Sequence, residues 1–378
     1  MLDMNYSTTY CCNIYPLSSL DDFIHLLKIT QPQIAKVLNK DPFKMGLWAP
    51  NFLLDELMKE KNIELCKNLM REHNLDVITF NGFPYSKFHG ETVKEKVYLP
   101  DWSQKERLMY LKKVSQFAHA LDSKTTVIST LSGGFLPDDS IEKKNTYIEN
   151  MLEWVQWASY YEKETGFIAK VALEPEPYNT LQSSKDIISL WSDLKEEAAK
   201  LNIEASTLNK YLGICLDVCH FSVIYENPTY VYKTLKQNHI PVHKFQLSIS
   251  PKWTPENKIS LEQFFGLDEP VYLHQSFAST ENKVESFLDL HLAKQANLKG
   301  AKEWRTHFHI PLFLSEQSHT TGADLIELLN YLKEEQSECI LEVETYSFSA
   351  LKDLYNIDLT VEESIIRELQ WLENHLKN

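Results

Sequence analysis

The chain has 378 residues, of which 43% are hydrophobic, and this is enough to bury a large core. Its formal net charge is −15, which argues against binding to a nucleic-acid backbone because such binding needs a basic surface. No apolar run reaches the roughly 18 residues of a membrane span, and residues 1–13 lack the apolar stretch of a signal peptide, so we expect a cytoplasmic protein.

Strand-like and helix-like segments alternate along the whole chain. Short apolar runs predict eight buried strands, at 10–15, 44–49, 76–80, 125–130, 167–173, 212–216, 243–249 and 337–343. Helical periodicity predicts helices, at 19–39 with an interruption near Pro32, 51–74, 104–122, 145–164, 183–201, 228–238, 322–335 and 361–376. Eight strands with intervening helices are typical of a (β/α)8 TIM barrel.

Two segments are too long to be simple connections. About 90 residues separate the seventh and eighth strands, which is more than one βα unit requires. We therefore expect a single TIM-barrel domain over 1–378, with 251–314 inserted over the carboxyl rim. The loop 81–102 follows the third strand and is rich in Gly, Pro and aromatic residues. We expect this loop and the insertion to form a lid, with His89 and His309 lining a mostly apolar pocket.

Oxygen-bearing side chains lie at the ends of four predicted strands. Glu174 and Asp217 end the fifth and sixth strands, Glu344 follows the eighth, and Gln246 lies in the seventh. In an α/β barrel these ends meet at one rim, so we expect these side chains to converge. The alternatives are a surface carboxylate for Glu174, a helix cap for Asp217 and a core amide for Gln246. The sequence allows either Phe245 or Gln246 to face inward.

Three carboxylates and an amide at one point would repel one another unless a cation lay between them. Oxygen ligands suit Mg²⁺ or Mn²⁺, and Zn²⁺ is a further option. Such an ion can hold adjacent hydroxyl and carbonyl oxygens of a substrate and acidify the C–H between them, and a carboxylate on each face can then move the proton. We therefore predict a metal site, with Glu174 and Glu344 also catalytic. Glu342 is expected deeper in the barrel, where a buried carboxylate needs a partner.

Several histidines are further candidates. His220 follows Asp217 by three residues, and we predict that it is a catalytic residue that contacts substrate rather than metal; the alternative is a core imidazole. His307 and His309 would point to one side of a strand in the insertion, or lie at a solvent-facing edge. The residues predicted to bind substrate are Tyr85, His89, Glu176, His307 and His309.

Sequence motifs over nearly the whole chain resemble a known family. The resembling stretches include 79–85 (TFNGFPY), 94–102 (KEKVYLPDW), 173–177 (LEPEP), 216–220 (LDVCH), 307–311 (HFHIP) and 341–346 (LEVETY). The chain resembles xylose-isomerase-like TIM barrels of the sugar phosphate isomerase/epimerase superfamily, and more narrowly the EboE metabolite traffic proteins. The resemblance implies a metal site on Glu174, Asp217, Gln246 and Glu344, with His220 as a substrate contact. The basic residue that usually follows the third ligand is not evident.

We interpret the chain as a divalent-metal-dependent isomerase or epimerase for a small polyol, sugar or hydroxy-keto metabolite in a secondary-metabolite pathway. The alternative, implied by the narrower resemblance, is a non-catalytic metabolite-binding or traffic protein of the EboE type, and the aromatic content of 12% suits a ring-bearing ligand. An endonuclease is disfavoured by the negative charge. We expect a small-molecule partner, no nucleic acid and no membrane span. Protein partners from the same operon and the oligomeric state are left open.

Overall fold

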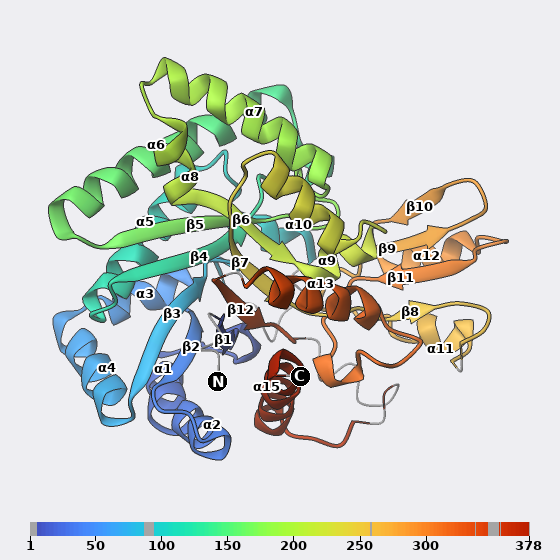
Figure 1. The fold of residues 1–378 in the computed structure, drawn as a ribbon, viewed down its shortest axis with the longest axis horizontal. Coiled ribbons are helices and arrows are strands. Elements are labelled where there is room, and N and C mark those ends of the chain that lie inside the picture. The colour runs from blue at the N-terminus through green and yellow to red at the C-terminus, as the bar shows by residue number, and fades with distance from the viewer. Residues whose placement is uncertain are drawn as a thin grey trace.

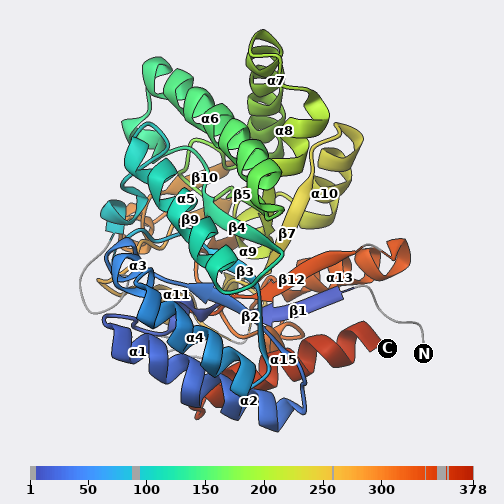
Figure 2. The ribbon, with the colours of Figure 1, turned by 90° about the vertical axis from the view of Figure 1, so that its left-hand side faces the viewer.

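Eight parallel strands form a nearly closed barrel surrounded by helices (Figures 1 and 2). The computed structural model describes residues 6–86, 94–257, 259–336, 338–346, 355 and 357–377. The strands adjoin in the order β1 (Tyr6–Tyr10), β12 (Cys339–Val343), β7 (Val242–Leu247), β6 (Leu212–Asp217), β5 (Ile168–Glu174), β4 (Thr125–Leu131), β3 (Leu75–Asn81) and β2 (Phe43–Trp48). A parallel bridge between Cys11 and Gly46 links the two ends of this order. The predicted (β/α)8 TIM barrel is confirmed.

The first strand lies earlier in the chain than the sequence predicts. The prediction placed it at 10–15, but β1 ends at Tyr10 and pairs in parallel with β12 from Tyr6 to Tyr10. A short 3-10 helix, η1 (Cys12–Ile14), occupies most of the predicted strand. Its residues are buried without being extended, so the apolar pattern there indicates burial rather than strand. The consequence is that Asn13 lies beyond the strand, at the carboxyl rim.

The helices cover the outside of the barrel (Figures 1 and 2). They are α1 (Leu20–His25), α2 (Gln31–Leu38), α3 (Asn51–Leu57), α4 (Glu60–Glu72), α5 (Lys105–Ala120), α6 (Ile141–Thr165), α7 (Ser184–Lys200), α8 (Ala205–Tyr211), α9 (Val218–Val223), α10 (Pro228–Gln237), α13 (Gly322–Glu335) and α15 (Val361–Lys377). A π-helical segment, η2 (Leu26–Thr30), interrupts the predicted 19–39 helix just before Pro32. Further 3-10 turns are η3 (Lys94–Tyr98), η4 (Leu136–Asp138) and η5 (Leu312–Leu314). Within the described ranges, every helix is too short or too polar to cross a membrane.

The interior of the barrel holds a buried ion pair. Lys244 on β7 and Glu342 on β12 are both fully buried, and Lys244 Nζ lies 2.5 Å from Glu342 Oε2. The same ammonium donates to Ser129 Oγ at 2.9 Å. The predicted need of Glu342 for a partner is therefore met by Lys244. Gly46 on β2 makes room for this pair, because a Cβ at that position would lie 1.6 Å from Glu342 Oε1.

The insertion, residues 251–314, forms a separate antiparallel sheet beside the barrel. Its strands adjoin in the order β10 (Val284–Phe287), β9 (Ser276–Ser279), β11 (Glu303–Thr306) and β8 (Lys252–Trp253), with two short helices, α11 (Leu261–Phe265) and α12 (Leu290–Ala296). Trp304 on β11 is buried between Phe265 and Phe287. Figure 1 shows this sheet projecting to one side of the barrel, beyond α9.

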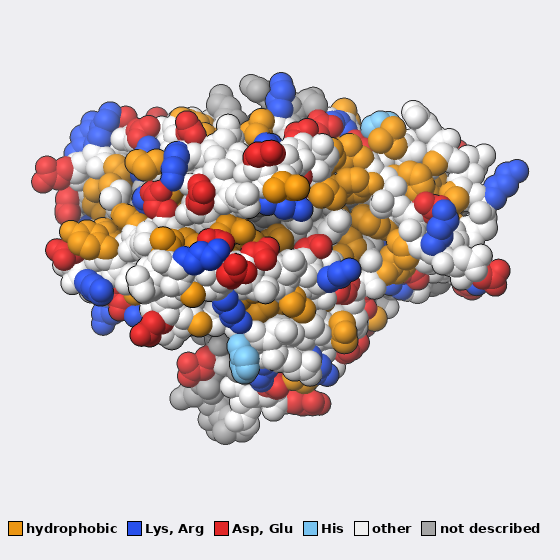
Figure 3. Space-filling model, turned by 90° about the horizontal axis from the view of Figure 1, so that it is seen from above, with side chains coloured by type: hydrophobic (Ala, Val, Ile, Leu, Met, Phe, Trp, Pro, Cys, Tyr) orange, Lys and Arg blue, Asp and Glu red, His pale blue; other side chains and the backbone are white. Residues whose placement is uncertain are grey.

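The surface of the molecule carries mixed charge. On the face drawn in Figure 3, acidic and basic side chains are interspersed, with hydrophobic patches between them. This distribution accompanies the formal net charge of −15. The basic side chains on this face are scattered singly rather than gathered into the continuous stripe that tracks a nucleic-acid backbone.

Candidate metal and ligand site

Three carboxylates converge at the carboxyl rim of the barrel. Glu174 ends β5, Asp217 ends β6 and Glu344 follows β12, and each offers an oxygen within 4.8 Å of the other two. All three side chains are buried, with exposed fractions of 8%, 0% and 3%. The structure thus brings these three of the predicted metal ligands close to one another.

Glu344 is held by two asparagines and a histidine. Its Oε1 accepts hydrogen bonds from Asn13 Nδ2 at 2.5 Å and from Asn81 Nδ2 at 3.1 Å. Its Oε2 lies 3.3 Å from His309 Nδ1. Neither Asn13 nor Asn81 is among the site residues predicted from the sequence. A usable signal was present, because Asn81 ends the third strand and so lies on the same rim as the carboxylates.

Asp217 and Glu174 differ in their partners. Asp217 begins α9, and its Oδ1 accepts from the backbone N–H of His220 at 2.9 Å and from Ser248 Oγ at 2.9 Å. Asp217 therefore caps the N-terminus of α9, as the alternative interpretation expected, and it also lies at the rim of the barrel. Glu174 Oε2, in contrast, is buried with no hydrogen-bond partner among the described residues.

Gln246 lies level with Asp217 in the strand register. Phe245 packs on Tyr232 of α10, so Gln246 takes the inward-facing place on β7. It is paired in register with both Asp217 and Glu342, two residues before Glu344, and its Oε1 lies 3.8 Å from Cys215 Sγ. Among the described residues, neither Gln246 nor Asp217 lines the rim cavity. Ser248, two residues further along the same side of the chain, is the one that contacts Asp217.

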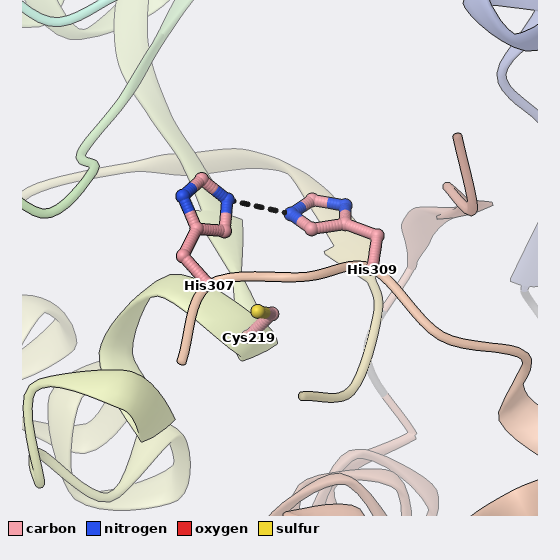
Figure 4. A group of neighbouring side chains, drawn as sticks. All are labelled: Cys219, His307 and His309. Atoms are coloured by element: carbon pink, nitrogen blue, oxygen red, sulfur yellow. Dashed lines mark hydrogen bonds between the residues drawn. The ribbon is translucent and has the colours of Figure 1, made fainter. Parts of the chain in front are cut away.

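Three histidines lie together beside the carboxylates. His307 and His309 come from the insertion and His220 from α9, and all three are buried. His307 Nε2 and His309 Nε2 are 3.1 Å apart, and His309 Nε2 and His220 Nε2 are 3.3 Å apart. Figure 4 shows the contact between His307 and His309, with Cys219 next to them. A solvent-facing edge, the alternative for His307 and His309, is excluded by their burial.

Of the other residues predicted to bind substrate, one lines the cavity and one is part of the packing between helices. Glu176 lines the cavity, where its Oε1 accepts from Tyr98 OH at 2.7 Å. Tyr85 packs on Tyr110 and its hydroxyl accepts from Asn51 Nδ2 at 2.9 Å, so it belongs to the packing between α3 and α5. His89 lies outside the described residues.

Burial and the charges of neighbouring groups shift the pKa values of these carboxylates and of His309 in different directions. Burial raises the pKa of Glu174 well above its ordinary value, and the carboxylates of Glu344 and Asp217 raise it further. Burial also acts to raise the pKa of Glu344, but its hydrogen bond with His309 and the charge of that imidazole lower it to about 2. Burial acts to lower the pKa of His309, but Asp217 and other anionic neighbours raise it well above the ordinary value. Without a cation, His309 and Glu344 therefore form an imidazolium–carboxylate pair.

A cavity with about 620 Å³ of empty space, part of it open to solvent, lies above the carboxylates and histidines. Its floor is polar and its wall is largely apolar and aromatic, contributed by Phe83, Val97, Tyr98, Leu131, Tyr272, Leu273 and Tyr346. The loop 81–102 and the insertion both line it, and they meet where Lys94 Nζ lies 2.5 Å from Asp289 Oδ2 and Gln275 Nε2 donates to Tyr98 OH at 2.8 Å.

Comparison with known proteins identifies the family. A family model described as "Xylose isomerase-like TIM barrel" matches residues 43–270, and no curated protein matches the sequence. Among solved structures, a xylose isomerase-like TIM barrel protein from Mycobacterium smegmatis in complex with magnesium is similar, with a TM-score of 0.53, 8% identity, and 94% of this chain and 89% of that chain covered. The probable 3-DHS dehydratase AsbF from Bacillus anthracis has a TM-score of 0.52 and 11% identity, and the match covers 97% of this chain and 99% of that chain. The IOLI protein with a binding zinc atom has a TM-score of 0.51 and 13% identity, and the match covers 98% of this chain and 97% of that chain. The chain belongs to the xylose isomerase-like TIM barrel family.

Proposed function

We propose that this protein is a divalent-metal-dependent isomerase or epimerase that acts on a small polyol, sugar or hydroxy-keto metabolite of a secondary-metabolite pathway. The observation that carries the proposal is the convergence of Glu174, Asp217 and Glu344 at the carboxyl rim, where Glu174 and Glu344 line a cavity. We further propose that the chain works as one domain, with 251–314 as an insertion over the rim. We place it in the cytoplasm, a reducing compartment in which its six cysteines stay free.

The carboxylate cluster fits a divalent cation. Three buried carboxylates with oxygens within 4.8 Å of one another repel when ionised, and the orphaned Glu174 Oε2 leaves a buried acceptor to be satisfied. Oxygen donors suit Mg²⁺ and Mn²⁺, and mixed oxygen and imidazole donors also suit Zn²⁺. We propose Glu174, Asp217 and Glu344 as ligands. Gln246, the fourth residue that the sequence suggests, is level with Asp217 in the strand register and is a further candidate ligand. The bound ion would supply Lewis-acid polarisation of ligand oxygens.

The protein's own residues provide the means to move a proton. Glu174 on β5 and Glu344 after β12 are separated in the ring by β6 and β7, so a ligand above them meets carboxylates from two different parts of the rim. One carboxylate can take a proton from carbon while the other returns it. Asn13 and Asn81 hold Glu344 in place through the oxygen that faces away from His309. The apolar wall above excludes water from the reacting carbon.

A second candidate is a non-catalytic metabolite-binding protein of the EboE traffic type, with partners from the same operon. The observation that favours it is the wall of the cavity, where Phe83 and Tyr98 stack with ring centroids 6.1 Å apart. Phe135, which is not part of the cavity lining, stacks on Tyr98 with centroids 5.2 Å apart. Such a surface suits a flat ring more than a bare triose or tetrose. Binding without turnover would need the same cavity but no proton transfer.

The discriminating experiment is solvent deuterium exchange. The purified protein with Mn²⁺, Mg²⁺ or Zn²⁺ is incubated in D₂O with a panel of ketoses, inososes and hydroxy-keto acids, and exchange at the carbon beside the carbonyl is followed by NMR. We expect exchange with at least one compound, and a loss of about 10³-fold or more in Glu174→Gln and Glu344→Gln, because each removes a proton acceptor.

Glu106→Gln serves as the control, since Glu106 is an exposed carboxylate in the first turn of α5. Retention of a compound through native purification, with no exchange in any metal form, would support the traffic protein instead. Circular dichroism and melting temperature establish that each variant is folded.

A further inference from the structure

Glu176 is a buried carboxylate that lines the cavity and is held by neutral groups. The residue is 8% exposed. Its Oε1 accepts hydrogen bonds from Tyr98 OH at 2.7 Å and from Gln275 Nε2 at 3.3 Å, and its Oε2 accepts from Asn179 Nδ2 at 3.0 Å. In the described part of the chain, no lysine or arginine lies within ion-pair distance of this carboxylate. Three donors therefore fix its position, and none of them carries a positive charge.

The basic side chain beside Glu176 is His307, which has another hydrogen-bond partner. His307 Nδ1 lies 3.7 Å from Glu176 Oε1 but 2.7 Å from Gln275 Oε1, so its proton is donated to the amide oxygen. The amide is oriented by its own Nε2, which donates to Tyr98 OH at 2.8 Å and to the Pro177 carbonyl at 3.2 Å. Glu176 thus lacks the counter-charge that a buried carboxylate usually has.

The ammonium group available at the cavity is already paired. Among the described lining residues, Lys94 is the one lysine or arginine. Its Nζ lies 2.5 Å from Oδ2 of Asp289, which is 2% exposed. The described lining therefore offers no unpaired lysine or arginine to a phosphate or carboxylate group of a ligand.

Aromatic rings adjoin the Glu176 carboxylate. Tyr98, whose hydroxyl donates to Glu176, stacks on Phe83 with ring centroids 6.1 Å apart, and both rings line the cavity. Tyr272 and Tyr346 also line it and meet edge to face with centroids 5.5 Å apart. A carboxylate among aromatic rings suits an organic ammonium group, because the carboxylate supplies the opposite charge and the ring faces attract cations.

We propose that the cavity takes a ligand with a protonated amino group, and that Glu176 binds this ammonium while oxygens of the same ligand lie at the carboxylate rim. The substrate class is then an amino-substituted polyol or ketose rather than a sugar phosphate or a hydroxy acid. The oxygen-bearing half of this inference rests on the proposed function, whereas the ammonium subsite requires neither turnover nor a particular metal.

Two ring probes of the same shape isolate the subsite. Benzylammonium and benzyl alcohol differ in carrying an ammonium or a hydroxyl, and their binding to Mg²⁺-loaded full-length protein is measured by ligand-observed NMR titration. We expect benzylammonium to bind about tenfold more tightly, because its hydrogen bond to Glu176 joins opposite charges. Glu176→Gln should abolish this preference and leave the affinity for benzyl alcohol within about twofold. Glu106→Gln, at an exposed carboxylate of α5, should keep the preference.

A substrate-sized series extends the test to the ligand class. In the D₂O exchange assay, 6-amino-6-deoxy-D-fructose is compared with D-fructose and D-fructose 6-phosphate, which share one carbon chain. We expect the amino compound to exchange at least about tenfold faster at low concentration, and Glu176→Gln to raise its KM by about tenfold. Where Glu176→Gln does not fold, Glu176→Ala replaces it in both experiments.

The outcomes separate the subsite from the proposed function. Equal affinity of the two ring probes, or an affinity for benzylammonium that is unchanged in Glu176→Gln, would overturn the ammonium subsite. Equal exchange rates of the three fructose compounds would overturn the substrate class. A preference for benzylammonium that depends on Glu176, with no exchange of any compound in any metal form, would support the subsite and overturn the proposed isomerase.

Discussion

Glu368 on α15 is a buried carboxylate directly behind the candidate site. Its oxygens accept from Thr345 Oγ1 at 2.7 Å and from the backbone N–H of Leu312 at 3.0 Å. Burial raises its pKa from the ordinary 4.5 to about 7, although these hydrogen bonds act to lower it. The folded state therefore binds the proton more tightly than the unfolded state does.

This linkage predicts a pH dependence of stability. Since the folded state holds the Glu368 proton up to about pH 7 and the unfolded state loses it near 4.5, the free energy of unfolding should fall as the pH rises through this window, by about 3 kcal/mol at most. Glu368→Gln does not titrate, so its free energy of unfolding relative to wild type should rise between pH 4.5 and 7.5. Urea unfolding at several pH values measures this. Parallel pH profiles of the two proteins would contradict the prediction.

At the scale of elements, β2 and β12 approach across the barrel at Gly46. The register of β2 against β3 shifts between Met45 and Gly46, and a Cβ on Gly46 would lie 1.6 Å from Glu342 Oε1 and 2.8 Å from its Cδ. Neither atom can move far, because the glutamate is buried and paired with Lys244.

Gly46→Ala should therefore lower the free energy of unfolding by about 3 kcal/mol or more, as overpacking displaces the ion pair. Chemical denaturation measures the change. Gly266→Ala, at the end of α11 with its nearest atom 3.2 Å away, is the control and should cost less than about 1 kcal/mol. Equal losses in the two variants would show that the close approach at Gly46 has no special effect.

The ion pair itself links β7 to β12. Lys244→Met leaves the Glu342 carboxylate buried without its partner, so we expect a loss of about 3–5 kcal/mol in the free energy of unfolding. The double variant Lys244→Met/Glu342→Leu should recover most of this loss, because no buried charge remains. A double-mutant cycle from urea unfolding tests the coupling. Strictly additive effects of the two single variants would contradict it.

At the scale of the whole molecule, the contact between His309 and His220 joins two parts that are distant in sequence. The two residues are 89 residues apart in the chain, one in the insertion and the other on the barrel. His309 also lies 3.3 Å from Glu344, so an ion bound by Glu174, Asp217 and Glu344 would lie next to this junction. Such an ion would stabilise the folded state by mass action, by about 2.7 kcal/mol at a hundred times the Kd.

Zinc should accordingly raise the melting temperature and slow proteolytic cleavage within the insertion. Thermal melting and limited proteolysis with and without a chelator measure both effects. In Glu174→Gln the zinc-dependent protection of the insertion should disappear, while Glu106→Gln keeps it. Protection that survives in Glu174→Gln would place the stabilising ion elsewhere.

The sequence by itself determined the architecture and the rim on which the site lies. Eight apolar runs with helices between them predict the barrel, because each run must be buried and parallel strands need crossovers. The carboxylates could be found because a residue at the end of such a strand, like Glu174 or Asp217, lies on the catalytic rim whatever the details of packing.

Only the tertiary structure decided how far along the barrel each side chain lies and which atoms it contacts. Gln246 and Ser248 share one side of the chain, and the register places Gln246 level with Asp217 and Glu342 while Ser248 donates a hydrogen bond to Asp217. The ring orientations of His307 and His309 depend on acceptors contributed by other segments, such as Gln275 Oε1 and Glu344 Oε2. A local pattern specifies which face a side chain occupies, but the packing of segments remote in sequence sets which atoms meet.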